Sequence, residues 1–433
     1  MRAQIVKDRR RAGGGSRLQR ALALAASATV ACILAAAPAQ AKNLYNLDPS
    51  ADSGGQIVVD SAGNGYVAWL RKGSPDLVMF CKIPANGRCA NAINLPLPSA
   101  NASNGGTDQP FAVLGGTNQV WVIAPRSVLG DIVYWASLDG GQTFGPPVDV
   151  TAAGDFADKT TVSDVLLEPS EPSIGNTPPV AYFDIASVNP GLGYSWLPSN
   201  LVPGGNPTSF SFANTGPDVA TAALAEQPNG YPLEAYSTLG SGGSGSPDQV
   251  FFFRQTAANG SVAALPDAWT STPTMAGLGY LPALTSGPKG LFLAYEAYVT
   301  EGLSGIPSAT DVLPYDQASG MFGTATTLAV DGPQNTSLGD GGTINENATT
   351  GELGVIWPKF GGSGAVMRLW VSTNGGARWS GVRNVAKGGG GYTGTAALAM
   401  NAKGGGFLAF RTSSGLQIAN LAQLSKPKKK HKH

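Results

Sequence analysis

The sequence predicts an all-β fold, a seven-bladed β-propeller. Glycine (59 residues) and proline (31 residues) are abundant while 42% of the residues are hydrophobic, a composition typical of short buried strands joined by tight turns. A short apolar strand recurs along the chain at near-regular intervals, and turn motifs separate the strands around it. One repeated β unit explains all three observations.

The recurring strand is centred on a small or apolar residue, as in Y-V-A-W at 66–69 and F-L-A-Y at 292–295. Its central positions, separated by 53 to 62 residues, are Ala68, Ala124, Ala181, Ala235, Ala294, Ile356 and Ala409. Seven units of this length match the four-stranded blades of a propeller.

Each unit repeats the same internal order. A first strand, such as 56–59 or 110–113, precedes a Gly- or Asn-containing turn and the recurring strand. Third strands are expected at 77–80, 132–135, 193–196, 250–253, 312–315, 369–371 and 416–419. A fourth strand closes the unit, for example at 92–97 or 147–151.

The two ends of the folded region complement each other. The last unit ends near residue 424 without a fourth strand, and N-terminal residues 43–51 resemble 93–100, which contain a fourth strand in their own unit. We therefore expect the N-terminal strand to complete the last blade and close the ring, which removes an exposed sheet edge.

Both termini differ in composition from the rest. Residues 1–41 combine a basic start with an Ala/Leu/Val run and a small-residue cleavage site, and they predict a secretory signal peptide. The propeller is expected at 42–424. Residues 425–433 are a lysine-rich tail that either contacts anionic envelope polymers or is simply solvated. No other stretch is long and apolar enough to predict a transmembrane segment.

Cys81 and Cys89 are the only cysteines after the predicted signal peptide. They flank a segment with the turn pair Asn86-Gly87, so they can face each other across a hairpin. In an exported protein this predicts a disulfide, with two free buried thiols as the alternative.

Composition excludes several function classes. The only histidines, His431 and His433, lie in the tail, which removes Ser-His-Asp and Cys-His catalysis and most zinc sites. Without the signal peptide and the five tail lysines, the body has 16 basic and 27 acidic residues. An acidic body argues against nucleic acid as a partner of the domain.

A turn motif, S-L-D-G-G-Q-T-F, follows an apolar strand at 137–144, and a second copy with Asn in place of Asp, S-T-N-G-G-A-R-W, lies at 372–379. The acidic or amide side chain accepts bonds from backbone N–H groups ahead of it, and the glycines supply positive φ angles. These segments resemble the Asp-box repeats of sialidase-like β-propellers. The resemblance implies structural roles for Ser137, Asp139, Gly141, Thr143, Phe144, Ser372, Asn374, Gly376 and Trp379. In that family the motif is a folding device, so it predicts architecture and not activity.

Polar or charged residues lie two or three positions after the central residue of each recurring strand. They are Arg71, Arg126, Asp184, Ser237, Thr238, Glu296, Lys359 and Arg411. Strand ends are where long charged side chains reach water, so solvation is the alternative explanation for all of them.

Sialidases hold a substrate carboxylate with three arginines, because a planar guanidinium binds carboxylate in a bidentate manner. The resemblance therefore implies ligand binding by Arg71, Arg126 and Arg411, which come from units that are neighbours once the ring closes. It also makes Glu296 with Tyr298 a candidate nucleophile pair and Asp184 a candidate acid/base. Sialidases have six blades, and the count of seven departs from that pattern.

Other residues offer weaker candidates. Trp69, Trp121, Trp196, Trp357 and Trp370 are able to stack on sugar rings, but their strand positions favour packing between blades. Calcium is the one metal considered: Asp155, Asp158 and Asp164, or Asp340 with Glu346, have hard oxygen ligands but no specific loop spacing. No cofactor is expected.

The sequence thus favours a secreted or cell-envelope protein, expected to be a monomer, that acts as a non-catalytic glycan- or cell-surface-binding module. An exo-glycosidase of sialidase type is the first alternative. A structural or protein-binding envelope propeller, held by its tail, is the second.

Overall fold

The computed structural model describes residues 44–71, 73, 77–97, 110–115, 118–126, 131–149, 159–168, 180–187, 192–197, 210–214, 219–238, 248–256, 270, 273–298, 307–333, 341–359, 366–387, 396–402 and 404–421. Within these residues every regular element is a β-strand, and no helix is present that is long and apolar enough to cross a membrane. The predicted signal peptide and basic tail lie outside the described residues.

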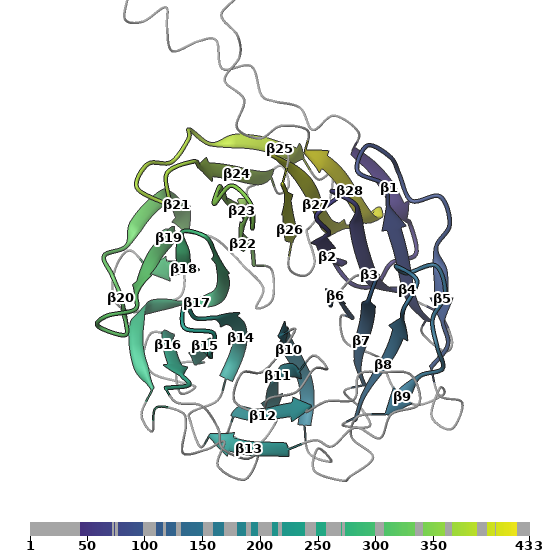
Figure 1. The fold of residues 1–433 in the computed structure, drawn as a ribbon. Helices are drawn as coiled ribbons and strands as arrows, with labels where there is room; N and C mark the ends of the chain where they lie inside the picture. Colours follow the sequence, from purple (N-terminus) through teal and green to yellow (C-terminus); the bar gives the residue numbers. More distant parts are fainter. Residues whose placement is uncertain are drawn as a thin grey trace, which may run out of the picture. The chain divides into compact units, whose positions relative to one another are not determined.

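Four sheets hold four antiparallel strands each, in chain order (Figure 1). The first comprises β2 (Gln56–Val59), β3 (Gly65–Arg71), β4 (Leu77–Ile83) and β5 (Ile93–Leu95). The second comprises β6 (Phe111–Leu114), β7 (Val120–Arg126), β8 (Asp131–Ser137) and β9 (Val148–Asp149). The third comprises β10 (Lys159–Glu168), β11 (Val180–Ser187), β12 (Leu192–Leu197) and β13 (Phe210–Asn214). The fourth comprises β22 (Thr343–Glu346), β23 (Leu353–Lys359), β24 (Val366–Ser372) and β25 (Arg383–Lys387).

A fifth sheet combines strands from both ends of the described chain. Its order is β1-β28-β27-β26, formed by β1 (Leu44–Asp48), β26 (Ala397–Asn401), β27 (Gly405–Thr412) and β28 (Gly415–Leu421). β1 runs antiparallel to β28 at the outer edge of this sheet, with Leu44 opposite Ala419.

The remaining strands form one eight-stranded sheet. They are β14 (Val219–Glu226), β15 (Pro232–Thr238), β16 (Gln249–Arg254), β17 (Thr274–Gly287), β18 (Gly290–Tyr298), β19 (Pro307–Asp316), β20 (Met321–Phe322) and β21 (Thr326–Pro333). The sequence predicted two separate units here. They are joined because the first part of the 14-residue β17 pairs with β16 and its second part pairs with β18.

The hydrophobic core lies between neighbouring sheets. One cluster combines residues of β2–β4 with residues of β26–β28, and another combines β3–β5 with β6–β8. The first strands of the sheets also contact one another in series: β2 meets β6 and β26, β10 meets β6 and β14, and β22 meets β17 and β26. Trp69, Trp121, Trp357 and Trp370 are buried in this core, as the sequence predicted. The side chain of Trp196 lies outside the described part.

The predicted disulfide between Cys81 and Cys89 is confirmed. It links β4 to the loop that leads into β5, across eight positions of sequence.

The turn at 137–144 is built around one carboxylate. Asp139 Oδ1 accepts hydrogen bonds from the backbone N–H groups of Gln142 and Thr143, and Asp139 Oδ2 accepts one from Thr143 Oγ1 at 2.6 Å. Ser137 Oγ donates to Asp139 Oδ1 and accepts from the N–H of Gly141. Gly140 and Gly141 have φ angles of 74° and 80°, which explains why glycine is needed at both positions. These hydrogen bonds hold the pKa of Asp139 well below its usual range.

The turn at 372–379 has the same geometry with an amide. Asn374 Oδ1 accepts from Ser372 Oγ at 3.0 Å and from the N–H of Arg378 at 2.9 Å. Gly375 and Gly376 have φ angles of 66° and 80°. An asparagine therefore provides the same local acceptor as the aspartate, without the charge.

Replacing Asp139 with alanine is expected to lower the free energy of unfolding by about 0.5–2 kcal/mol at pH 7, the range for loss of a capping acceptor. Because the folded-state pKa is depressed, the charged form stabilises the fold above the unfolded pKa near 4, and this part is lost as the pH falls through the folded value. Urea unfolding at pH 7 and pH 3 checks both points. The Asp139→Asn control should lose less stability, because Asn374 accepts the same kind of hydrogen bonds at the second turn. If Asp139→Asn lost as much stability as Asp139→Ala, the side-chain acceptor would not be what stabilises the turn.

Candidate functional site

Most of the residues that the sequence singled out lie at or near the C-terminal end of the second strand of each four-strand unit. Arg71, Arg126, Thr238, Tyr298 and Lys359 are the last residues of β3, β7, β15, β18 and β23. Ser237, Glu296 and Arg411 lie one or two positions before the ends of their strands, and Asp184 lies further inside β11. The side chains of Arg126 and Asp184 are outside the described part.

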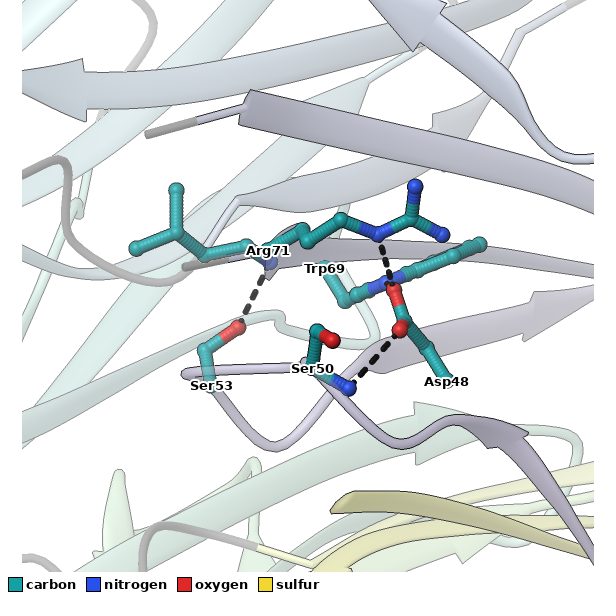
Figure 2. A network of polar contacts seen from close by, with 6 residues as sticks. Asp48, Ser50, Ser53, Trp69 and Arg71 are labelled. Atoms are coloured by element: carbon teal, nitrogen blue, oxygen red, sulfur yellow. Dashed lines mark hydrogen bonds and ion pairs between the residues drawn. The ribbon is translucent and has the colours of Figure 1, made fainter. Parts of the chain in front are cut away.

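Asp48 organises the first cluster at these strand ends (Figure 2). Its Oδ2 accepts hydrogen bonds at 2.7 Å from Trp69 Nε1 and from Arg71 Nε, and its Oδ1 accepts from the N–H of Ser50 at 3.0 Å. Asp48 and Trp69 are almost fully buried, whereas the Arg71 side chain remains 35% exposed. The carboxylate therefore fixes one side of the guanidinium and leaves the rest near the surface.

Arg411 is held by the same short segment. Its Nη2 lies 3.0 Å from Oδ1 of Asp52, and the backbone N–H of Asp52 donates to the carbonyl of Leu70 at 2.7 Å. Ser53 Oγ accepts from the N–H of Leu70, so residues 48–53 bind to the end of β3 at several points (Figure 2). Two of the three predicted arginines thus converge on one short segment: Arg71 pairs with Asp48 at the end of β1, and Arg411 pairs with Asp52 in the connection that follows.

A second cluster surrounds the end of β18. The Tyr298 hydroxyl donates to Oδ2 of Asp248 at 2.6 Å, and the rings of Tyr298 and Tyr280 lie 5.7 Å apart. Glu296 is two residues before Tyr298, on the same face of the strand, and is only 5% exposed. The cluster brings two carboxyl groups and two phenols together.

The environment of Tyr298 keeps its hydroxyl protonated. Burial raises the pKa of Tyr298, and the hydrogen bond to Asp248 and the negative charges of Asp248 and Glu296 raise it further. At neutral pH the hydroxyl is therefore a hydrogen-bond donor and not a phenolate nucleophile.

The backbone beside this cluster is irregular. Leu281 has a φ angle of 56°, a left-handed conformation that is unfavourable for a leucine, and the register of β17 against β18 shifts between Tyr280 and Ala283. The N–H of Gly279 donates to the backbone carbonyl of Asp248 at 2.9 Å. Bulges and strained residues concentrate at functional sites, so this strand supports the choice of the cluster as a candidate site.

Sequence reasoning found Glu296 and Tyr298 but missed Asp48, Asp248 and Tyr280. Along the chain, Asp48 lies 23 positions from Arg71 and Asp248 lies 50 positions from Tyr298, and nothing local marks either aspartate. Tyr280 follows Gly277 and Gly279, and isolated glycines inside a strand pattern are a recognised signal of a bulge.

The candidate calcium ligands do not form a described site. Glu346 is 5% exposed and its Oε1 accepts a hydrogen bond from the N–H of Lys289 at 2.6 Å. Asp155, Asp158 and Asp340 lie outside the described residues, as does the side chain of Asp164. Among the residues that the structure describes, no group of three or more His, Cys, Asp or Glu side chains is arranged to hold a metal ion.

No family model matches the sequence, and no curated protein matches it. Among solved structures, the chain is similar to the BP39L lectin from Burkholderia pseudomallei, with a TM-score of 0.58 and 11% identity over 88% of this chain and 98% of the lectin. It is also similar to a polysaccharide lyase of family PL25, an ulvan lyase bound to -[GlcA(1-4)Rha3S]-, with a TM-score of 0.54 and 11% identity over 87% of this chain and 96% of the lyase.

A Hadza microbial sialidase, Hz136, aligns at a TM-score of 0.45 and 10% identity over 86% of this chain and 65% of the sialidase, a likeness too low to support an assignment. At these identities the likeness concerns the fold alone. Together with the all-β sheets, it identifies the architecture of the chain as a β-propeller-type fold.

Proposed function

We propose that residues 42–424 form a seven-bladed β-propeller closed by β1, and that the turns at 137–144 and 372–379 are Asp boxes of the sialidase-like kind. Pairing of β1 with β28 and the serial contacts between first strands support closure. The strand pairing supports a count of seven blades. Seven groups of four successively paired strands can be traced in the described part of the chain, and their second strands are β3, β7, β11, β15, β18, β23 and β27. In this scheme β17 serves two blades.

The proposed function of this propeller is non-catalytic binding of glycans. The observation that carries it is the hydrogen bond from Tyr298 to Asp248 within a cluster that also contains Glu296 and Tyr280. Carboxylates accept hydrogen bonds from sugar hydroxyl groups, and tyrosine combines an apolar ring with a polar tip. Because the phenol is protonated and already engaged, the same cluster is suited to binding and not to nucleophilic attack.

The arginines extend the site towards acidic sugars. A guanidinium has five N–H donors, and Asp48 uses one of those of Arg71. The remaining donors of Arg71 and Arg411, with Arg126, are proposed to contact carboxylate or sulfate groups of the ligand. The lyase of similar fold was solved with a saccharide that carries both kinds of group, and the lectin of similar fold is also a carbohydrate-binding protein.

The test combines a glycan array with turnover assays on the exported form of the protein. We expect binding to a subset of glycans and no hydrolysis of fluorogenic glycosides. Asp248→Asn should weaken the binding about tenfold or more, since a hydrogen bond to a charged group contributes roughly 1.5–3 kcal/mol.

Asp60→Asn is the matched control. Asp60 accepts a hydrogen bond from the Tyr66 hydroxyl at 2.8 Å, so it repeats the Tyr–Asp pair of the cluster at another place in the fold. The control should bind glycans normally. Equal losses in the two variants, or no glycan bound by the parent protein, would refute the proposed function.

A glycosidase of sialidase type is the second candidate function. It is favoured by the position of Glu296, a buried carboxyl group two residues before Tyr298 on the same face of β18. Turnover of a fluorogenic sialoside that Glu296→Gln abolishes would establish this alternative and replace the binding function.

Export by the predicted signal peptide is part of the proposal, and the disulfide between Cys81 and Cys89 supports it, since such bonds persist in oxidising compartments. We also propose that the exported protein is a monomer whose lysine-rich tail contacts anionic envelope polymers.

A further inference from the structure

A pocket of about 270 Å³ lies beside the second Gly-Gly turn, away from the strand-end clusters. It opens between the turn that joins β24 to β25 and the strands β18, β19 and β21 of the eight-stranded sheet. Its lining residues are Phe292, Val312, Pro314, Thr324, Thr326, Gly375, Gly376, Ala377 and Trp379.

The first turn packs closely on its neighbouring sheet. Gly141 sits against Phe80, where an added Cβ would lie 2.8 Å from the ring, and Phe144 meets Phe80 edge to face with ring centroids 4.8 Å apart. Lys82 Nζ donates to the carbonyl of Gly140 at 3.2 Å. At this junction between the turn and the neighbouring sheet, the Phe80 ring thus fills the space and Lys82 binds the turn through a hydrogen bond.

Strand register shows which residues correspond at the second turn. Phe80 pairs with Ala68 in the first sheet, and Val312 pairs with Ala294, the centre of the corresponding strand. Valine therefore occupies the position of the filling phenylalanine.

The position that corresponds to Lys82 also differs at the second turn. Lys82 pairs with Tyr66, and Pro314 pairs with Phe292 in the same way. Proline has no donor to bind the turn, and valine is much smaller than phenylalanine. The pocket thus occupies the volume that Phe80 and Lys82 fill at the first junction and that Val312 and Pro314 leave open at the second.

The lining of the pocket defines what it can hold. Phe292 and Val312 are buried apolar residues, and Nε1 of Trp379 is buried, so the accessible part of this indole is carbon. Thr324 and Thr326 are exposed and add two hydroxyl groups. None of the nine lining residues is charged.

The volume lies just below the range of pockets for drug-sized ligands, about 300–1,000 Å³, so it suits a single ring. A pyranose presents C–H groups on one face and hydroxyl groups around its rim. This pattern matches an apolar wall with threonines beside it, and the lack of charge excludes any gain from a carboxylate or sulfate.

We propose that this pocket is a second saccharide site, specific for one neutral pyranose unit and independent of the strand-end clusters. The inference rests on the proposed glycan-binding function and adds a separate place and ligand class to it. Val312 and Pro314 create the space, Phe292 and Trp379 receive the ring face, and Thr324 and Thr326 bind its hydroxyl groups.

Saturation-transfer NMR with a panel of neutral methyl glycosides, and with glucuronic acid as the charged comparison, tests this site. Val312→Phe restores the residue found at the first junction and should weaken binding of the neutral glycosides about tenfold or more. Thr326→Val keeps the volume, removes one hydroxyl from an exposed position, and should weaken binding several-fold, so the test holds even if the phenylalanine variant folds poorly.

The two sites fail in different ways. Val312→Phe should weaken binding of the neutral glycosides by the same factor whether or not Asp248 is replaced by asparagine, and glucuronic acid should not compete with them at the pocket. If glycans bind on the array but Val312→Phe and Thr326→Val behave like the parent, the pocket is not a site and the proposed function stands. If no neutral methyl glycoside binds at all, the pocket inference is likewise overturned.

Discussion

Replacing Asp48 with alanine is expected to lower the free energy of unfolding by about 1–4 kcal/mol, because it leaves a buried indole donor without its acceptor and breaks an ion pair whose arginine is partly exposed. Asp48 is 2% exposed and accepts from Trp69 Nε1, Arg71 Nε and the N–H of Ser50. Alanine would leave a buried indole donor and part of a guanidinium without acceptors. Urea unfolding followed by tryptophan fluorescence measures the loss.

Asp52→Ala is the matched control for this effect. Asp52 lies in the connection that follows Asp48 and also pairs with an arginine, but the side chains of Asp52 and Arg411 are 34% and 26% exposed. Water can replace the lost partner, so the expected cost is about 0–1 kcal/mol. If the two variants lost equal stability, burial would not be the reason that Asp48 matters.

Asp48 also shows why part of the site could not be predicted. The sequence placed Arg71 and Arg411 at strand ends correctly, because a strand boundary is a local feature of hydrophobic pattern. Their partners are Asp48 at the end of β1 and Asp52 in the connection that follows, and Arg411 is 359 positions from Asp52. A contact of that length depends on how the sheets are assembled, and no local pattern specifies it.

The two Gly-Gly turns were predicted well for the opposite reason. Every acceptor and donor around Asp139 lies within four residues of it, so the motif carries its own geometry. The third strands were found because their apolar runs are bounded by turns. The fused sheet was not, since the sequence does not show that the single strand β17 pairs on both sides.

The cluster at Tyr298 falls between these cases. Glu296 was identified from its place two positions after the central residue of its strand, and Tyr298 from its nearness to Glu296. Tyr280 comes from the neighbouring strand β17 and Asp248 from the residue just before β16, and the bulge that includes Leu281 sets how they meet. Hydrophobic periodicity predicts side-chain neighbours only where the register between two strands is regular. It therefore cannot predict which side chains meet across this bulge.

Replacing Phe80 with alanine is expected to cost about 3–5 kcal/mol, the range for deleting a buried phenylalanine. Phe80 is fully buried, packs edge to face with Phe144, and supports the turn at Gly141 from the neighbouring sheet. The variant therefore opens a cavity at the junction of two sheets and removes an aromatic contact worth roughly 0.5–1.5 kcal/mol beyond burial. Urea unfolding measures the change.

Val312→Ala is the matched comparison. Val312 corresponds to Phe80 at the second turn, where the pocket lies. Two methylene equivalents are lost there, which predicts a cost of about 1–2 kcal/mol, because the space beside Val312 is open before the substitution. The difference between the two variants reports how much of the stability at Phe80 comes from filling the junction. If Val312→Ala were as costly as Phe80→Ala, the two junctions would be equally packed, and the space beside Trp379 would not be available to a ligand.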